Sequence, residues 1–250
     1  MQVGVDVGGT FTDFSCVSID GERLTFKLPS TTNDPSEGVI AGIKELINQT
    51  NISPAEISVF AHGTTVATNA VLERKGASLG LLTTEGFRDV LEIGRQMRTQ
   101  MYSVRLKPET PIFLAPGARR LGVVERIAPD GSIVKPLDED SLKKAVEELL
   151  IQGVEAVAIA FLFSFINPEH ELRAREIISK KWPSLTISIS SEVDPVFREY
   201  ERTVVTAFDA YIKPTVDTYL SNLSEALEKE GISAPLQVMQ SRGGLAGGKT

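Results

Sequence analysis

The sequence predicts an α/β fold with a mixed sheet, and two observations support this prediction. Near the N-terminus, two runs of alternating apolar residues, 3–7 and 14–17, flank the turn Gly8-Gly9 and predict a β-hairpin. Further along, short apolar strand patterns alternate with helical patterns, and residues 156–161 are apolar throughout, as in strands buried on both faces. A hairpin followed by such alternation is typical of a mixed sheet covered by helices.

The first third of the chain continues with a strand, a helix and a strand. Residues 23–28 form the next strand pattern. Asp34-Pro35 marks a helix start, with Asp as N-cap and Pro at the first helical position, and the helix should end near residue 48. Residues 57–61 predict a short buried strand, and a helix should follow the segment 62–65 and end near residue 73.

The remaining elements follow the same alternation. We expect strands at 79–83, 156–161, 185–189 and 236–240, and helices at 138–151 and 168–182. Residues 122–126 and 132–135 should form a second hairpin, and residues 94–116 a long exposed loop. A long helix should begin near Asp194-Pro195 and end near residue 230, with Pro214 kinking or dividing it.

Composition limits the possible function classes. The net charge of −7 argues against a general nucleic-acid binder. The longest apolar stretch, 156–163, is far shorter than the ~20 residues that span a bilayer. Cys16 is the single cysteine, so no internal disulfide can form, and we expect it to be packed in a strand. With no pattern of a signal peptide at the N-terminus, we expect a cytoplasmic protein with no nucleic-acid or membrane partner.

The first hairpin has an unusual turn. Glycines let backbone amides approach an oxyanion closely, and adjacent turn amides can form an anion-binding concavity. Hydroxyls and carboxylates flank the glycines, and a carboxylate plus water is the environment that Mg²⁺ prefers. The residues of this candidate phosphate and magnesium site are Asp6, Gly8, Gly9, Thr10, Thr12 and Asp13, with Asp6 as the metal ligand. The alternative is an ordinary tight hairpin with a polar tip.

A second candidate segment is His62-Gly63-Thr64-Thr65, at the expected junction of a strand and a helix. The amides at a helix start, with Thr64 and Thr65, could bind a phosphate or a carboxylate, and His62 could transfer a proton. The alternative is a histidine that satisfies backbone groups beside threonines that cap a helix. The other histidine, His170, is expected to be solvent-exposed, and the few histidines and cysteines predict no transition-metal cluster.

Two further patterns are interpreted structurally. Residues 243–250, GGLAGGKT, match the phosphate-loop pattern, but no helix pattern follows them, so we interpret the match as a coincidence. Residues 198–202 have the spacing of salt bridges along a helix. Arg95, Arg98 and Arg105 in the expected loop are interpreted as solvated surface arginines.

Five ordered motifs resemble one enzyme family. They are VDVGGTFTDF, AHGTTVATNAVLERKGA, TTEGFRDVLEIGRQ, SSEVDPVFREYERT and VMQSRGG, and they cover nearly the whole chain. This set resembles the N-terminal region of the hydantoinase A / 5-oxoprolinase family, which includes ATP-dependent acetone and acetophenone carboxylase subunits. The resemblance implies the ribonuclease-H-like mixed sheet of the actin, sugar kinase and chaperone ATPase superfamily. It also implies ATP and Mg²⁺ as cofactors and a cyclic amide as substrate.

One feature of that family is missing here. Its members have a second glycine-threonine-aspartate loop, and this sequence has none. We therefore expect the first half of an enzyme, with a domain at residues 1–190 and the truncated start of a second domain, including the long helix, at 191–250. The expected partner is the missing C-terminal half or a B-type subunit, and an oligomer is expected.

The resemblance implies that ATP phosphorylates the amide oxygen of a lactam and so opens its ring. Catalytic roles then go to Asp6, Asp13 and His62, with Gly63, Thr64 and Thr65 joining the turn as cofactor-binding residues. An ATP-dependent carboxylase subunit and a fragment that is inactive in isolation stay open as alternatives.

Overall fold

The computed structural model describes residues 1–31, 34–97, 102, 104, 110–240 and 243–247. The chain divides into two compact units. The first contains Met1–Glu73 together with Thr215–Thr250, and the second contains Arg74–Pro214. The last part of the chain thus packs with the N-terminal strands, and the domain division expected at residue 190 stays a prediction.

The first unit is built on a mixed sheet with the strand order β12-β11-β4-β1-β2-β3. Strands β1 (Gln2–Val7), β2 (Phe11–Val17) and β3 (Arg23–Pro29) form an antiparallel meander, which confirms the predicted hairpin and the strand after it. Strand β4 (Val59–Thr64) pairs in parallel with β1, and β11 (Leu236–Met239) pairs in parallel with β4. The edge strand β12 (Leu245–Gly247) pairs with β11 and was not predicted.

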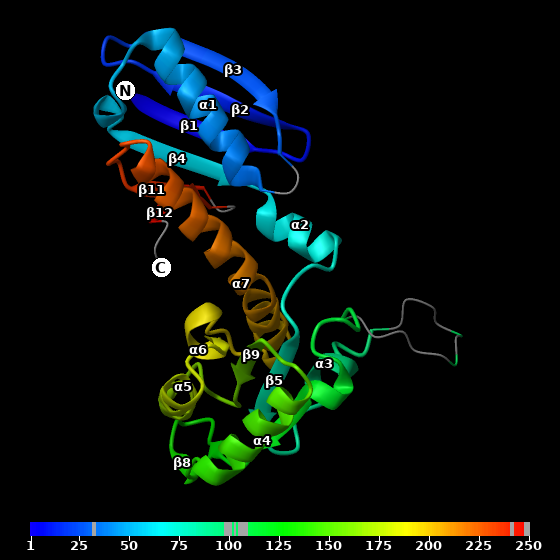
Figure 1. The fold of residues 1–250 in the computed structure, drawn as a ribbon. Helices are drawn as coiled ribbons and strands as arrows, with labels where there is room; N and C mark the ends of the chain where they lie inside the picture. The colour runs from blue at the N-terminus through cyan, green and yellow to red at the C-terminus, as the bar shows by residue number, and fades with distance from the viewer. Residues whose placement is uncertain (32–33, 98–101, 103, 105–109, 241–242, 248–250) are drawn as a thin grey trace. The chain divides into compact units, whose positions relative to one another are not determined.

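Helices cover one face of this sheet. Helix α1 (Pro35–Thr50) begins at Asp34, whose carboxylate accepts the Ser36 amide, as predicted from the Asp-Pro pair. Figure 1 shows α1 lying across the strands β1 to β3. The apolar residues of α1 and of the last part of α7 pack into one core with Val3, Val5, Phe14 and Phe60 of the strands. The short elements η1 (Pro54–Glu56) and α2 (Val66–Leu72) flank β4.

The second unit contains a four-stranded parallel sheet with the order β10-β9-β5-β6. Its strands are β5 (Leu79–Thr84), β6 (Arg120–Val123), β9 (Ala156–Ala160) and β10 (Thr186–Ile189). Helices α4 (Glu139–Ile151) and α5 (Glu169–Lys181) pack on it, and every residue of β9 is buried, as predicted. The short helices are α3 (Val90–Ile93), η2 (Gly117–Arg119) and α6 (Ser190–Val193).

The second predicted hairpin is only partly right. Strands β7 (Arg126–Ile127) and β8 (Ile133–Lys135) do pair, but Gly122 and Val123 belong to β6. Pairing with β5 draws these residues into the parallel sheet, where Gly122 lies opposite Thr83. Within the expected loop at 94–116, Arg98 and Arg105 lie outside the described residues. Arg95 forms an ion pair with Glu201 at 2.8 Å, so it is not simply solvated.

Helix α7 (Glu199–Lys229) is the predicted long helix, but it begins at Glu199 and not at the expected Asp194-Pro195 pair. It is continuous through Pro214, so the proline does not divide it, although the boundary between the compact units follows this residue. Arg198, the residue before the helix, forms an ion pair with Glu201 at 3.8 Å, which has the expected i,i+3 spacing. None of the helices described in this structure is long and apolar enough to cross a membrane.

The expectation that His170 is exposed was wrong. Its side chain is buried in the first turn of α5, and Nδ1 lies 2.7 Å from Oε2 of Glu125. Glu125 is itself buried and accepts the Thr84 hydroxyl with its other oxygen. A buried carboxylate needs partners, and His170 supplies one, which explains why this helix start is not solvated.

Candidate functional site

Asp6 and Asp13 lie side by side on the exposed face of the first sheet. Side chains alternate along a strand, so the apolar residues of β1 and β2 point toward α1 while these carboxylates point outward. Pairing of β1 with β2 places Asp6 opposite Asp13, and Lys27 of β3 lies opposite Asp13. On the other side of Asp6, β4 contributes Gly63. One row across four strands therefore reads Gly, Asp, Asp, Lys.

This row crosses a shallow hollow of about 560 Å³. Its floor consists mostly of small residues, including Gly4, Ala61 and Gly63, and Met239 of β11 closes one end. The remaining lining residues are Val5, Asp6, Asp13, Phe14, Ser15, Thr25, Phe26 and Lys27. A broad floor with two carboxylates and one ammonium group can accept a ligand that combines an apolar part with a hydrated cation or a phosphate.

The turn between β1 and β2 is held by Ser30. The Ser30 amide donates to the Thr10 carbonyl at 2.9 Å, and its hydroxyl donates to the Gly8 carbonyl at 2.8 Å. The Gly8 amide is used within the turn, where it donates to the Phe11 carbonyl at 3.0 Å. Within the part of the chain that the structure describes, the amides of Gly9 and Thr10 make no hydrogen bond, and both residues are exposed. These two amides are available to an anion.

Thr12 occupies a different position from the one its sequence suggested. It lies on the inward face of β2 with no exposed surface, and its hydroxyl lies 3.0 Å from the Ser30 hydroxyl. The Thr12 side chain thus supports the turn from inside, and a direct contact with phosphate stays a prediction.

The end of β4 lies beside this turn. Thr64 is in register with Val7, the last residue of β1, and the Thr65 hydroxyl donates to the Val7 carbonyl at 3.4 Å. The Thr64 hydroxyl accepts the Val66 amide at the start of α2. The structure therefore brings together the two segments that the sequence singled out separately, because β1 and β4 are parallel neighbours.

His62 points away from the carboxylates. The sequence placed the end of the strand at residue 61, but β4 continues to Thr64, and the alternation along it puts Gly63, not His62, beside Asp6. The His62 ring is fully buried on the helix side of the sheet, and its Nε2 atom lies 2.8 Å from the Tyr219 hydroxyl of α7. A role for His62 in proton transfer at the exposed face does not follow from this position.

The environment of His62 keeps the ring neutral. Burial lowers the pKa of His62 to about 4, and the nearby Val5 backbone opposes this only in part. The Nδ1 atom has no hydrogen bond of standard geometry among the described residues. Burial also raises the pKa of the Tyr219 phenol, with the Thr64 hydroxyl acting in the opposite direction. Both groups are therefore uncharged near neutral pH.

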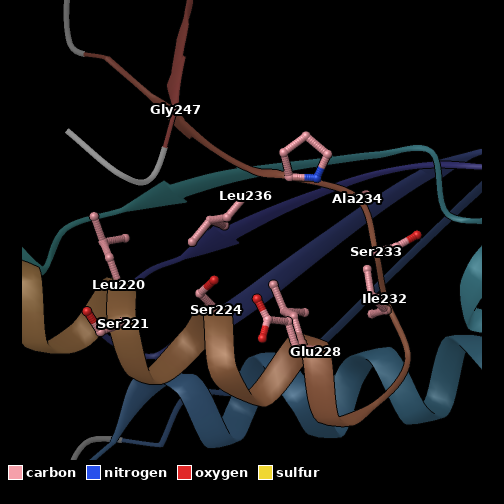
Figure 2. A pocket seen from close by; sticks show the side chains of 11 residues that line it. Leu220, Ser221, Ser224, Glu228, Ile232, Ser233, Ala234, Leu236 and Gly247 are labelled. Atoms are coloured by element: carbon pink, nitrogen blue, oxygen red, sulfur yellow. The ribbon is translucent and has the colours of Figure 1, made fainter.

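A second hollow, of about 550 Å³, lies along the last turns of α7, and nothing in the sequence indicated it. Figure 2 shows Leu220, Ser224 and Glu228 on α7 facing the chain that leads into β11, with Leu236 opposite. The lining is mainly apolar with a few hydroxyls and one carboxylate. This hollow is separate from the row of carboxylates.

The phosphate-loop pattern at the C-terminal end does not form a strand–loop–helix unit in its described part. Residues 243–247 make a tight turn and then the strand β12, with the Gly243 amide donating to the Gln240 carbonyl. Lys249 and Thr250 lie outside the described residues. Among the residues that are described, no group of three or more histidine, cysteine, aspartate or glutamate side chains is placed to hold a metal ion.

Two family models match this chain. Residues 2–182 match the hydantoinase/oxoprolinase N-terminal region, and residues 202–250 match the hydantoinase/oxoprolinase model. The chain belongs to the hydantoinase/oxoprolinase family. Its motifs, recognised above as a resemblance, are confirmed by these matches.

Relatives in this family have several activities. The caprolactamase alpha subunit of Pseudomonas jessenii is 37% identical over 99% of this chain, and the acetophenone carboxylase gamma subunit of Aromatoleum aromaticum is 34% identical over 98%. The crystal structure of the ATP-dependent caprolactamase from Pseudomonas jessenii matches 99% of the chain with a TM-score of 0.89 and 34% identity. The mixed α/β fold is therefore shared with that structure. The chain spans only about a third of these relatives, 36%, 35% and 36% respectively.

Proposed function

We propose that this chain is the N-terminal part of an ATP-dependent enzyme that opens a cyclic amide. The observation that supports the proposal most is the row of Asp6 and Asp13 beside the free amides of Gly9 and Thr10. Such a combination suits a magnesium-bound phosphate. The similarity to a protein described as an ATP-dependent caprolactamase supplies the substrate class, a lactam.

The residues present fit Mg²⁺ and the terminal phosphates of ATP. Asp6 and Asp13 offer oxygen ligands on a face that is open, and a hydrated Mg²⁺ needs only one or two carboxylates. Gly9 and Thr10 offer amide donors to the phosphate oxygens, and Thr10 adds an exposed hydroxyl. Thr64 and Thr65 border the same turn.

The chemistry explains why such an enzyme needs ATP. Resonance makes a lactam carbonyl a poor electrophile, and a phosphoryl group from ATP on the amide oxygen would make the carbonyl carbon reactive. Water would add to that carbon, the ring C–N bond would break with the amine as leaving group, and hydrolysis of the resulting acyl phosphate would release phosphate. This chain would hold the phosphates with its turn amides. Asp6 and Asp13 would hold the cation, whose positive charge would balance that of the phosphates. The remaining contacts would come from the part of the protein beyond this chain or from a partner subunit. We also propose, from the family resemblance, that the fold belongs to the actin, sugar kinase and chaperone ATPase superfamily.

An ATP-dependent carboxylase subunit is the second candidate. The observation that favours it is the 34% identity to the acetophenone carboxylase gamma subunit, nearly as high as the identity to caprolactamase. Both reactions can use the same phosphate site, so the residues described above do not separate them.

A substrate panel tests the proposal. The complete protein, with any partner subunit that it requires, is incubated with Mg-ATP and a lactam, a hydantoin, 5-oxoproline or a ketone plus bicarbonate. We expect one cyclic amide to stimulate ATP consumption and to yield the ring-opened amino acid in equal amount. Stimulation by the ketone alone, with carboxylated product, would favour the carboxylase. If none of these compounds stimulated ATP consumption, the result would contradict both candidates.

A further inference from the structure

We propose that Gly63 is a positioning residue, whose missing side chain leaves the space in which the Asp6 carboxylate lies. This inference rests on the proposed magnesium-phosphate site and assigns a role to the β4 side of that site. It replaces the expected role of Gly63 as a direct cofactor-binding residue.

The contact between the two residues is close. Asp6 and Gly63 are in register on the parallel strands β1 and β4 and share the exposed face of the sheet. A methyl group built on Gly63 would lie 2.9 Å from Oδ1 of Asp6 and 3.5 Å from its Cγ. The distance to Oδ1 is shorter than a normal contact, so the carboxylate in its present position requires a glycine at 63.

Backbone conformation does not explain the glycine. Gly63 is not among the glycines with positive φ, such as Gly86 and Gly131, where other residues would be strained. The nearest atom to the added methyl is the end of a flexible side chain, and the nearest backbone atom, Cα of Asp6, is 3.8 Å away. An alanine at 63 would therefore move the carboxylate and leave the strand in place.

The direction of that movement matters. Strand β1 lies between β4 and β2, so Gly63 and Asp13 flank Asp6 on opposite sides. A carboxylate displaced from the β4 side moves toward Asp13, and like charges facing each other across a strand pair repel. Gly63 thus lets the Asp6 carboxylate lie on the β4 side, away from Asp13.

The test compares G63A with G117A in the 250-residue chain. Gly117 belongs to η2 and is not part of the hollow; its φ is not positive, and a methyl there would meet no atom within 4 Å. Mn²⁺, used in place of Mg²⁺, is titrated with water-proton relaxation to obtain the dissociation constant, and NMR line broadening locates the ion. Melting temperatures monitor the fold.

We expect Mn²⁺ to broaden the signals of Asp6 and Asp13 in the wild type and in G117A, with equal affinity. G63A should bind Mn²⁺ about 10- to 100-fold more weakly at an unchanged melting temperature, the range typical of a lost supporting contact. In a D6N background, G63A should have no further effect on Mn²⁺ affinity, because its effect is exerted through Asp6.

Three results would overturn the inference. Wild-type Mn²⁺ affinity in G63A would show that the carboxylate does not need this space, while leaving the proposed metal site intact. Unfolding of G63A, or an equal loss of affinity in the D6N background, would show a role in the sheet itself. Absence of Mn²⁺ at Asp6 in all the proteins would overturn the proposed metal site together with this inference.

Discussion

At the scale of single residues, the face of the sheet on which a side chain lies decides which chemistry is open to it. Asp6 and His62 belong to neighbouring strands, yet one faces solvent and the other faces the helices. The exposed carboxylates are available to a cation, whereas His62 and Tyr219 form a buried, neutral hydrogen-bonded pair. Two predictions follow from these opposite environments.

Replacing Asp6 by asparagine in the complete enzyme should lower ATP turnover without disturbing the fold. Asparagine keeps the shape of the side chain but removes the charge that would face Mg²⁺. The loss of one preorganised electrostatic group commonly costs about 2–4 kcal/mol of barrier, or about 10²–10³ in rate. Steady-state ATPase assays and melting curves provide the measurement. The control is Asp20→Asn, because Asp20 is exposed in the loop between β2 and β3. Near-normal turnover in D6N would exclude Asp6 from the mechanism.

His62 should make the stability of the chain depend on pH. Its folded pKa of about 4 lies below the unfolded value of 6.5, so the unfolded chain binds the proton more readily. The His62 contribution is therefore fully present above pH 6.5 and is lost as the pH falls from about 6.5 through about 4, by about 1.4 kcal/mol per unit.

Chemical denaturation of the chain between pH 4 and pH 8 measures this dependence. His62→Gln has a polar amide of similar size that cannot titrate, and the free energy of unfolding of this variant should fall less over the same range. NMR titration of the ring should show His62 neutral at pH 6. Protonation of His62 near pH 6.5 in the folded chain would contradict its buried assignment.

At the scale of elements, neighbouring residues set a helix cap, while pairing sets strand ends. Asp34 caps α1 as its sequence predicted, because a cap depends only on neighbouring residues. The similar Asp194-Pro195 pair does not begin α7, which starts at Glu199. The end of β4 was misplaced because pairing with β1 continues to Thr64, and residues 122–123 were assigned to the second hairpin although pairing with β5 places them in β6. The position of Thr64 and Thr65 beside the turn thus depends on β1–β4 pairing, which no local pattern reveals.

The cap of α1 is testable by Asp34→Ala. The Asp34 carboxylate accepts both the amide and the hydroxyl of Ser36, at 2.9 and 2.6 Å. Its removal should reduce the free energy of unfolding by about 1 kcal/mol, the usual cost of losing an N-cap. Urea denaturation of D34A and of the surface control Asp20→Ala provides the comparison. Equal stability of D34A and the wild type would mean that the packing of α1, and not its cap, determines where the helix begins.

At the scale of the whole molecule, the candidate site is open to solvent on one side. The described residues supply donors to phosphate and carboxylates for a cation, but the hollow beside them is shallow and open. The caprolactamase subunit is almost three times as long as this chain, since the chain covers 36% of it. Phosphate contacts open to water are screened and weak.

We therefore expect the 250-residue chain to fold but to bind Mg-ATP with a dissociation constant no tighter than about 1 mM, or about −4 kcal/mol. It should show no substrate-stimulated ATPase activity. Isothermal titration calorimetry with Mg-ATP measures the affinity, and Mg-pyrophosphate is the matched ligand without a nucleoside. Micromolar binding of ATP but not pyrophosphate would show that this chain already contains a nucleoside pocket.

The sequence by itself determined the family, the strand–helix alternation, the first hairpin and the caps, because each depends on residues close together in the chain. It also identified the carboxylates and glycines of the turn. Only the tertiary structure decided that Gly63 and not His62 lies beside Asp6, that Thr12 and His170 are buried, and that the chain after Pro214 joins the N-terminal sheet. The burial of Thr12 and His170 involves partners that are distant in the sequence, Ser30 and Glu125. The position of Gly63 depends on register between strands distant in sequence, and a shift of one residue reverses which side chains face the site.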